Sequence, residues 1–188
     1  MKRLLFIALT TLQLTACGGA SSSPKLEVND GSKSLTLNLK SGEVYYGNVI
    51  STYPGKASLQ TFAHDIVLAN YDIDQTTTHK PLTAPEQMRV EVQLTGEAGT
   101  KEDSPLKVGT YRVKNEAINR VRSIGIRTFA DGKENKTYFE TMSSSSTADG
   151  EVTIKSITND TVSGEMNLTD GAKFVKGTFT AKLPAAKK

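Results

Sequence analysis

The sequence has no tryptophan, only one cysteine, Cys17, and only two histidines in 188 residues. A single cysteine cannot form a disulfide within the chain, so packing and hydrogen bonds must hold the fold together. Zinc sites built from several cysteines are excluded for the same reason. His64 and His79 lack the spacing of a zinc-binding helix motif, and we expect both to be solvated, at a strand edge and in a loop. The sequence therefore predicts no metal site built on histidine.

Blocks of one charge are also missing. Removal of Lys2 and Arg3 with an N-terminal leader leaves 21 basic residues against 20 acidic ones, so the remaining chain is almost neutral. The pair Lys187-Lys188 is its only concentrated basic stretch. Nucleic acids attract proteins with a pronounced basic surface. We therefore expect no nucleic-acid partner.

The N-terminal residues have the composition of a secretion signal. Lys2 and Arg3 precede an apolar stretch over residues 4–14, which is shorter than the roughly 20 residues that a membrane-spanning helix needs. A positive start followed by a short apolar stretch is typical of a cleaved leader. We predict a signal peptide over residues 1–16.

The leader ends in Leu14-Thr15-Ala16-Cys17, a string that resembles the lipobox of bacterial lipoproteins. The resemblance implies a diacylglyceryl group on the Cys17 sulfur, cleavage before Cys17, and a further acyl chain such as palmitate on the new amino terminus. It also implies an anchor in the cell envelope, at the outer membrane in a host with two membranes, because Gly18 rather than aspartate follows the cysteine. An ordinary secretory signal that leaves a free thiol is the alternative. No cofactor is expected beyond the covalent lipid.

The residues after Cys17 are small and polar and predict a flexible tether. We place the lipidated cysteine and this tether at residues 17–33. The remaining residues, 34–188, have the length of one domain of ordinary size.

From residue 34 onward, apolar residues recur at every second position, which indicates half-buried strands. In the segment 88–95, for example, Met88, Val90, Val92 and Leu94 alternate with polar residues. Similar alternation occurs at 35–39, 152–155, 162–168 and 175–183, and weaker strand candidates lie at 44–50, 57–62, 65–70, 108–114, 124–129 and 136–142.

Turn-forming pairs such as Asp131-Gly132 and Asp170-Gly171 separate these segments. About ten strands without a long amphipathic helix predict an all-β fold. We favour an antiparallel β-sandwich, because a small closed β-barrel, the alternative, usually has more even strand lengths.

Catalytic motifs are not recognisable. There is no GxSxG nucleophile motif, no phosphate-binding loop and no dinucleotide fingerprint, and the SxxK string from Ser22 to Lys25 falls in the predicted tether. The serine run Ser143 to Ser146 has the composition of a loop. We assign no catalytic residues and expect binding rather than catalysis. A hydrolase built from scattered carboxylates is an alternative, and it would require a concave pocket that holds paired carboxylates with raised pKa values.

Two groups of residues are candidate binding sites. Asp65, Asp72 and Asp74 could contribute to a weak calcium loop, although position six of the EF-hand pattern is Thr76 rather than glycine and position twelve is Pro81 rather than glutamate. The second group consists of four tyrosines, Tyr45, Tyr46, Tyr53 and Tyr71. They could form an exposed patch that recognises protein or carbohydrate, or they could pack into the core.

The sequence thus predicts a lipid-anchored envelope protein that acts as a non-catalytic protein-binding or scaffold module. Exposed strand edges offer one mode of binding, because an extended segment can join a sheet through main-chain hydrogen bonds. An inhibitor, immunity or phage-exclusion lipoprotein that sequesters an envelope-active protein is the first alternative. A hydrolase with an unrecognised carboxylate site is the second.

Overall fold

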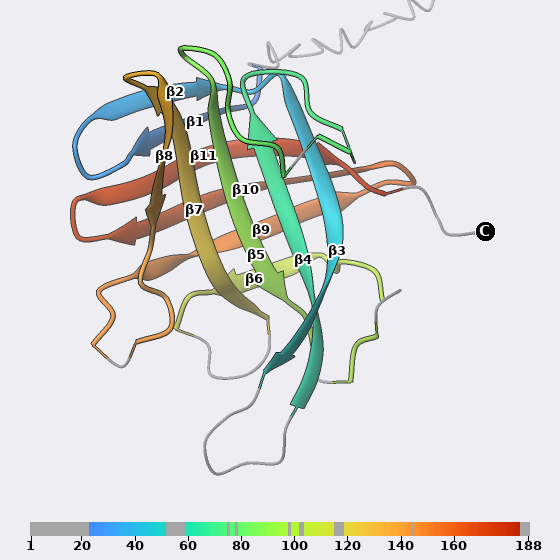
Figure 1. Ribbon diagram of the computed structural model, residues 1–188. Coiled ribbons are helices and arrows are strands. Elements are labelled where there is room, and N and C mark those ends of the chain that lie inside the picture. Colours follow the sequence, from blue (N-terminus) through green and yellow to red (C-terminus); the bar gives the residue numbers. More distant parts are fainter. Residues whose placement is uncertain are drawn as a thin grey trace, which may run out of the picture.

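The alternating segments form strands that close into a barrel (Figure 1). The computed structural model describes residues 23–184 except 52–58, 75, 78, 98, 102–103, 115–118 and 144. The strands of this part are β1 Lys25–Asn29, β2 Ser34–Asn38, β3 Ser41–Ser51, β4 Leu59–Ala69, β5 Met88–Thr95, β6 Gly109–Arg112, β7 Arg120–Ala130, β8 Lys133–Tyr138, β9 Asp149–Ile157, β10 Thr161–Asp170 and β11 Lys173–Lys182. The described residues contain no helix with the length and hydropathy of a membrane span.

Eight strands form the closed ring, in the order β3, β4, β5, β7, β6, β9, β10, β11 and back to β3. In Figure 1, β3, β4, β5 and β7 run from top to bottom and cross β9, β10 and β11. The two sets join at two corners, and each corner is a single parallel pair of residues: Arg112 with Arg120, and Lys182 with Glu43. The predicted all-β class is confirmed. Of the two predicted architectures, the structure has the closed barrel, and its sheet is mixed rather than purely antiparallel because of these corners.

Three strands lie outside the ring. β8 pairs with β7, and β1 pairs with β11 and with β2. Leu26 and Val28 of β1 are fully buried in the core. Residues 25–33, which the sequence analysis places in the tether, therefore form a strand and a turn of the folded domain.

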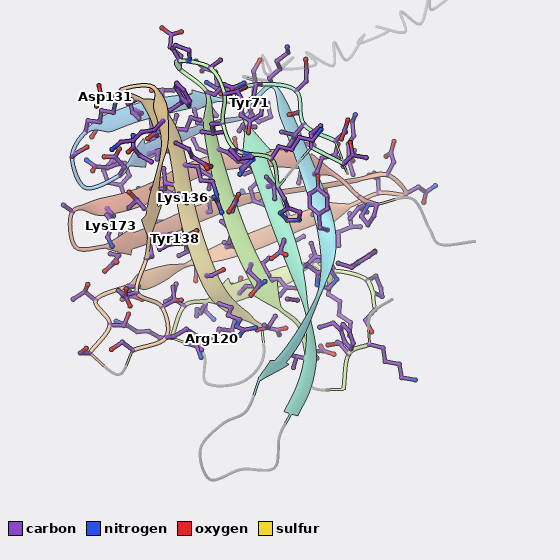
Figure 2. All side chains as sticks on the ribbon, viewed as in Figure 1. Tyr71, Arg120, Asp131, Lys136, Tyr138 and Lys173 are labelled. Carbon is purple, nitrogen blue, oxygen red and sulfur yellow. The ribbon has the colours of Figure 1, made fainter. Side chains whose placement is uncertain are left out.

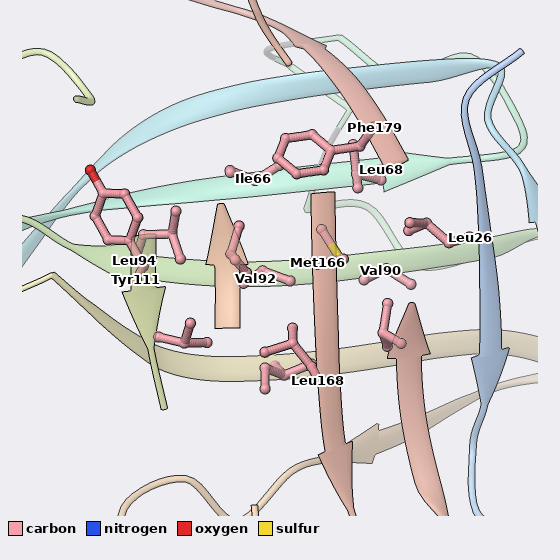
Figure 3. Packing of buried hydrophobic residues seen from close by; sticks show 14 of the residues in the cluster. Leu26, Ile66, Leu68, Val90, Val92, Leu94, Tyr111, Met166, Leu168 and Phe179 are labelled. Carbon is pink, nitrogen blue, oxygen red and sulfur yellow. The ribbon is translucent and has the colours of Figure 1, made fainter. Parts of the chain in front are cut away.

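The inward side chains fill the barrel. The predicted inward set of β5 (Met88, Val90, Val92 and Leu94) is buried, as are Val162, Met166 and Leu168 of β10. Figure 3 shows Phe179 and Met166 packed between the two crossing sets of strands. An eight-stranded barrel is just wide enough for its side chains to fill the interior or to leave room for one small ligand. Here a single cluster of apolar side chains occupies the interior.

Candidate binding surface

Four of the charged side chains on the outer face of β5, β7 and β8 form what we call the outer-face ion network: Arg89, Glu91, Arg127 and Glu134. Alternation places them there, because Val90 and Val92 between them point into the core. Arg89 is nevertheless only 1% exposed. The segment after β4 covers it, and its Nη1 donates to the Tyr71 hydroxyl at 3.2 Å and to the Lys80 carbonyl at 2.9 Å.

The network pairs two positive with two negative side chains. Glu91 Oε1 lies 2.8 Å from Nε of both Arg89 and Arg127. Glu134 Oε1 lies 3.3 Å from Arg127 Nη1 and 3.7 Å from Arg89 Nη2. Burial of a charge is costly unless a partner compensates it. The four groups compensate one another, and they hold the outer face of these strands in one arrangement.

Tyr138, at the end of β8, lies beside the outer-face ion network with 52% of its surface exposed (Figure 2). Arg127 Nη2 donates to its hydroxyl at 3.3 Å. Its ring occupies the space above Gly125 of β7, where a Cβ would lie 3.3 Å from a ring carbon. Tyr138 is therefore an exposed aromatic side chain held from two sides.

A hollow of about 480 Å³ lies along the outer face beyond Tyr138. Its lining residues are Gln93, Arg122, Ser123, Phe139, Glu140, Thr141 and Met142. Met142 is 62% exposed. The hollow thus combines an exposed thioether with polar side chains from β5 and β7.

Arg122 reaches the outer face because of an irregularity in β7. Gln93 pairs with Ser123 but the next residue, Leu94, pairs with Val121, so Arg122 is the extra residue of a β-bulge. Bulges re-aim side chains and are frequent beside functional sites. Within the described part of the chain, the Arg122 guanidinium has no ion pair or hydrogen bond, and it can bind an anionic group from outside.

Asp65 lies on the same outer face, on β4. Gln93 Nε2 donates to its Oδ1 at 2.8 Å. Burial raises the pKa of Asp65, while the Gln93 bond and the charges of His79 and Arg122 act in the opposite direction. Its neighbour Glu91, which also raises this pKa, belongs to the ion network.

The two other predicted calcium ligands have protein partners. Asp72 accepts from Lys40 Nζ at 2.7 Å. Asp74 Oδ1 accepts from the backbone amides of Thr76 and Thr77 at 2.7 and 2.9 Å, and bonds from Thr76 lower its pKa. No group of three or more His, Cys, Asp or Glu residues in the described ranges could hold a metal ion. The structure therefore does not gather Asp65, Asp72 and Asp74 into one site.

The predicted tyrosines are mostly packed. Tyr45 and Tyr71 belong to a small apolar cluster on the outside of the barrel, and the Tyr45 hydroxyl donates to the Asp74 carbonyl at 2.9 Å. Tyr46 is half-buried, with its ring edge-on to His64 at 5.2 Å. Tyr53 and Cys17 lie outside the described residues. The three described tyrosines do not form one exposed patch.

His64 differs from its prediction. It lies within β4 and is only 2% exposed, with Nε2 2.9 Å from the Ser104 carbonyl. His79 is exposed, as expected, and its ring lies 6.0 Å from that of Tyr45. The polar string His64-Asp65 interrupts the apolar pattern, which is why sequence reasoning placed it at a strand edge.

Sequence reasoning missed Arg89, Arg122, Tyr138 and Met142. The Asp131-Gly132 turn was a usable signal for Tyr138, because a two-residue turn fixes the register that sets this ring above Gly125. No local pattern marks the bulge at Arg122 or the segment that covers Arg89. No family model, curated protein or solved structure matches this chain.

Proposed function

We propose that this protein is a lipid-anchored, non-catalytic module of the cell envelope that binds another protein through the face formed by Arg122, Tyr138 and Met142, here called the binding face. The observation that carries the proposal is the exposure of Tyr138 and Met142 next to a hollow lined by Arg122, whose guanidinium has no hydrogen bond or ion pair among the described residues. Aromatic residues, methionine and arginine are the residue types enriched at protein interfaces.

The packed barrel supports a partner that binds at the surface. Phe179, Met166 and Leu168 are at most 2% exposed and belong to the cluster that fills the interior. A small ligand inside the barrel would have to displace these side chains, at the cost of the apolar contacts that stabilise the fold. A surface partner leaves the core intact.

The binding face also defines the chemistry of the partner. The Arg122 guanidinium favours a carboxylate, because its planar donors match both carboxylate oxygens. The hollow beside Met142 suits an apolar side chain. We therefore infer a protein partner that presents an acidic residue next to an apolar one.

The anchor rests on Leu14-Thr15-Ala16-Cys17. Two or three acyl chains give lasting attachment, because each buried methylene contributes about 0.8 kcal/mol. Cys17→Ala should release the protein from the membrane fraction. It should leave the binding face intact.

The experiment is capture of partners from the native envelope by the tagged full chain, followed by a Kd measurement with the purified partner. Arg122→Ala, Tyr138→Ala and Met142→Ala should each weaken binding by about tenfold or more, as residues at the centre of an interface do. The matched control is Val108→Ala, because Val108 is 60% exposed but does not line the hollow. Equal affinity for all four variants and the wild type would overturn the proposal.

Protease treatment of intact cells locates the domain and bears on the alternatives. Cleavage of a C-terminal tag in wild type, but not in Cys17→Ala, indicates a surface location and favours a role in adhesion or exclusion. Protection until the envelope is opened favours a periplasmic scaffold or inhibitor.

A further inference from the structure

Two strands of the described sheet have an edge that no other described strand covers. β8 pairs only with β7, and β2 pairs only with β1. Exposed edges invite unwanted strand pairing, and natural proteins protect them with charged side chains, prolines or bulges. The two edges differ in this protection.

The backbone groups at the free edge of β8 belong to Glu134, Lys136 and Tyr138. Ala130 and Lys133 close the two-residue turn and therefore exchange backbone hydrogen bonds. The N–H and C=O groups of every second residue after Lys133, starting with Glu134, therefore point away from β7. Two of the three edge residues are charged, and Lys173 Nζ donates to the Tyr138 carbonyl at 2.8 Å. This edge is protected.

The free edge of β2 is built from Ser34, Thr36 and Asn38. Asp30 N donates to the Lys33 carbonyl at one end of the hairpin, and Leu39 N donates to the Pro24 carbonyl at the other. These two bonds fix which residues of β2 direct their backbone groups toward β1 and which direct them outward. Leu35 and Leu37 therefore bond to β1, and the three residues between and beside them direct their N–H and C=O groups outward. This strand, Ser-Leu-Thr-Leu-Asn, contains no charge, no proline and no bulge.

A groove of about 510 Å³ runs beside this unprotected edge. Its lining residues are Lys33, Leu35, Thr36, Asn70, Pro85, Glu86, Gln87, Met88, Thr128 and Phe129. Asn70 fixes the side of the groove formed by residues 85–88, since its Nδ2 donates to the Glu86 carbonyl at 2.7 Å and its Oδ1 accepts from Met88 N at 2.8 Å. The groove is thus preformed.

We propose that β2 takes up an extended segment of a partner polypeptide as an added strand in this groove. A row of outward N–H and C=O groups at strand spacing is matched by another main chain in extended conformation. Side chains at alternate positions of the segment then contact Leu35, Met88 and Phe129. Because these lining side chains are apolar, we expect apolar residues at those positions of the segment. Lys33 and Glu86 contribute one charge of each sign, so the segment is uncharged overall. This groove shares no residue with the binding face.

The probe is a set of ten-residue peptides selected by phage display on the full chain in detergent. Selected peptides should alternate apolar and polar residues, and Thr36→Pro and Thr36→Lys should each weaken their binding by about tenfold. The Thr36 N–H is not used in pairing with β1, so the proline removes no backbone bond of the sheet. Both variants remove only the exposed side-chain bond from Thr36 Oγ1 to Glu27, and an unchanged melting temperature verifies the fold. Thr178→Lys, a matched change at an exposed threonine of β11, should leave affinity unchanged. Equal binding by the Thr36 variants would overturn the proposal.

Amide hydrogen exchange followed by NMR tests the geometry directly. Peptide binding should slow exchange at Thr36, whereas the amide of Leu35, already bonded to β1, should be slow from the start. Lys136 on the edge of β8 is the internal control and should remain fast. Protection of Lys136 without protection of Thr36 would contradict the assignment to β2.

A second copy of this chain is the other polypeptide that could use the edge. Sedimentation analysis separates the two cases. A wild-type monomer supports the proposal. A wild-type dimer that Thr36→Pro converts to a monomer would overturn it, because the edge would then serve self-association.

Discussion

The ring of Tyr138 lies over Gly125, close enough that a Cβ on the glycine would be 3.3 Å from a ring carbon. The two residues face each other across the β7–β8 hairpin. Cross-strand neighbours are the pairs that stabilise a sheet, and here one member has no side chain, so the ring of the other lies over the glycine backbone. The glycine is therefore a condition for the exposed position of the tyrosine.

Gly125→Val should displace the Tyr138 ring and weaken binding to the captured partner by about tenfold, as loss of an interface residue does. The free energy of unfolding should change by less than about 1 kcal/mol, because valine suits a strand and the ring is free to move toward solvent. Paired titrations of wild type, Gly125→Val and Tyr138→Ala with the partner measure this. Full affinity in Gly125→Val would show that the ring position is irrelevant to binding.

Arg89→Met should lower the free energy of unfolding by about 3 kcal/mol, because it removes the most deeply buried of the cations that compensate Glu91 and Glu134. Arg89 is 1% exposed and Glu134 is 10% exposed, so water does not replace the lost interaction. Urea denaturation gives the value.

The control for this change is an exposed ion pair of similar geometry. Lys155 and Glu165 lie 2.5 Å apart with about half of each side chain exposed. Lys155→Met should cost less than about 1 kcal/mol. Similar losses for Arg89→Met and Lys155→Met would contradict a buried, mutually compensated network.

Strand positions and side-chain directions were predictable where the apolar pattern has a clear period of two. The strand over 88–95 and its inward residues are confirmed in β5. The segments predicted at 57–62 and 65–70, by contrast, contribute to a single strand, β4, which runs over Leu59–Ala69 in the described part of the chain. His64 and Asp65 break the pattern there, but each has a hydrogen-bond partner, the Ser104 carbonyl and Gln93, that lets the strand continue.

The closure of the barrel and most of the binding face had no local signal. The corner between β11 and β3 depends on one parallel residue pair, Lys182 with Glu43, between segments far apart in the sequence. Arg122 reaches the outer face through a register shift between β5 and β7, which depends on the partner strand. The charged residue Arg89 is buried because the preceding segment, between β4 and β5, folds over it. Each feature is a tertiary relationship that no single segment contains.

His64 should make the protein sensitive to acid. Burial lowers its pKa below the ordinary value of 6.5, and the bond to Ser104 only partly offsets this effect. The folded state therefore binds a proton less tightly than the unfolded state. The stability contributed by neutral His64 is complete above about pH 6.5 and is lost as the pH falls through the lower folded pKa.

His64→Gln removes this titration, so its free energy of unfolding should fall less than that of wild type between pH 8 and pH 5. Urea denaturation at both values measures the difference. His79→Gln changes the exposed histidine and should keep the wild-type dependence. An identical pH dependence in His64→Gln would show that other groups cause the acid sensitivity.

Gly177 allows β1 to pack closely beside β11, and this contact holds the β1–β2 hairpin whose outer edge we assign to peptide binding. A Cβ at Gly177 would lie 2.2 Å from the Lys25 carbonyl oxygen, a backbone atom that cannot move alone. Gly109 has a similar φ, +146° against +138°, but no atom lies within 4 Å of its Cβ position. The two glycines therefore separate steric contact from backbone strain.

Gly177→Ala should destabilise the fold by about 2 kcal/mol more than Gly109→Ala and accelerate amide exchange at Leu26. Equal effects would mean that backbone strain, rather than the close approach of β1, determines the loss of stability.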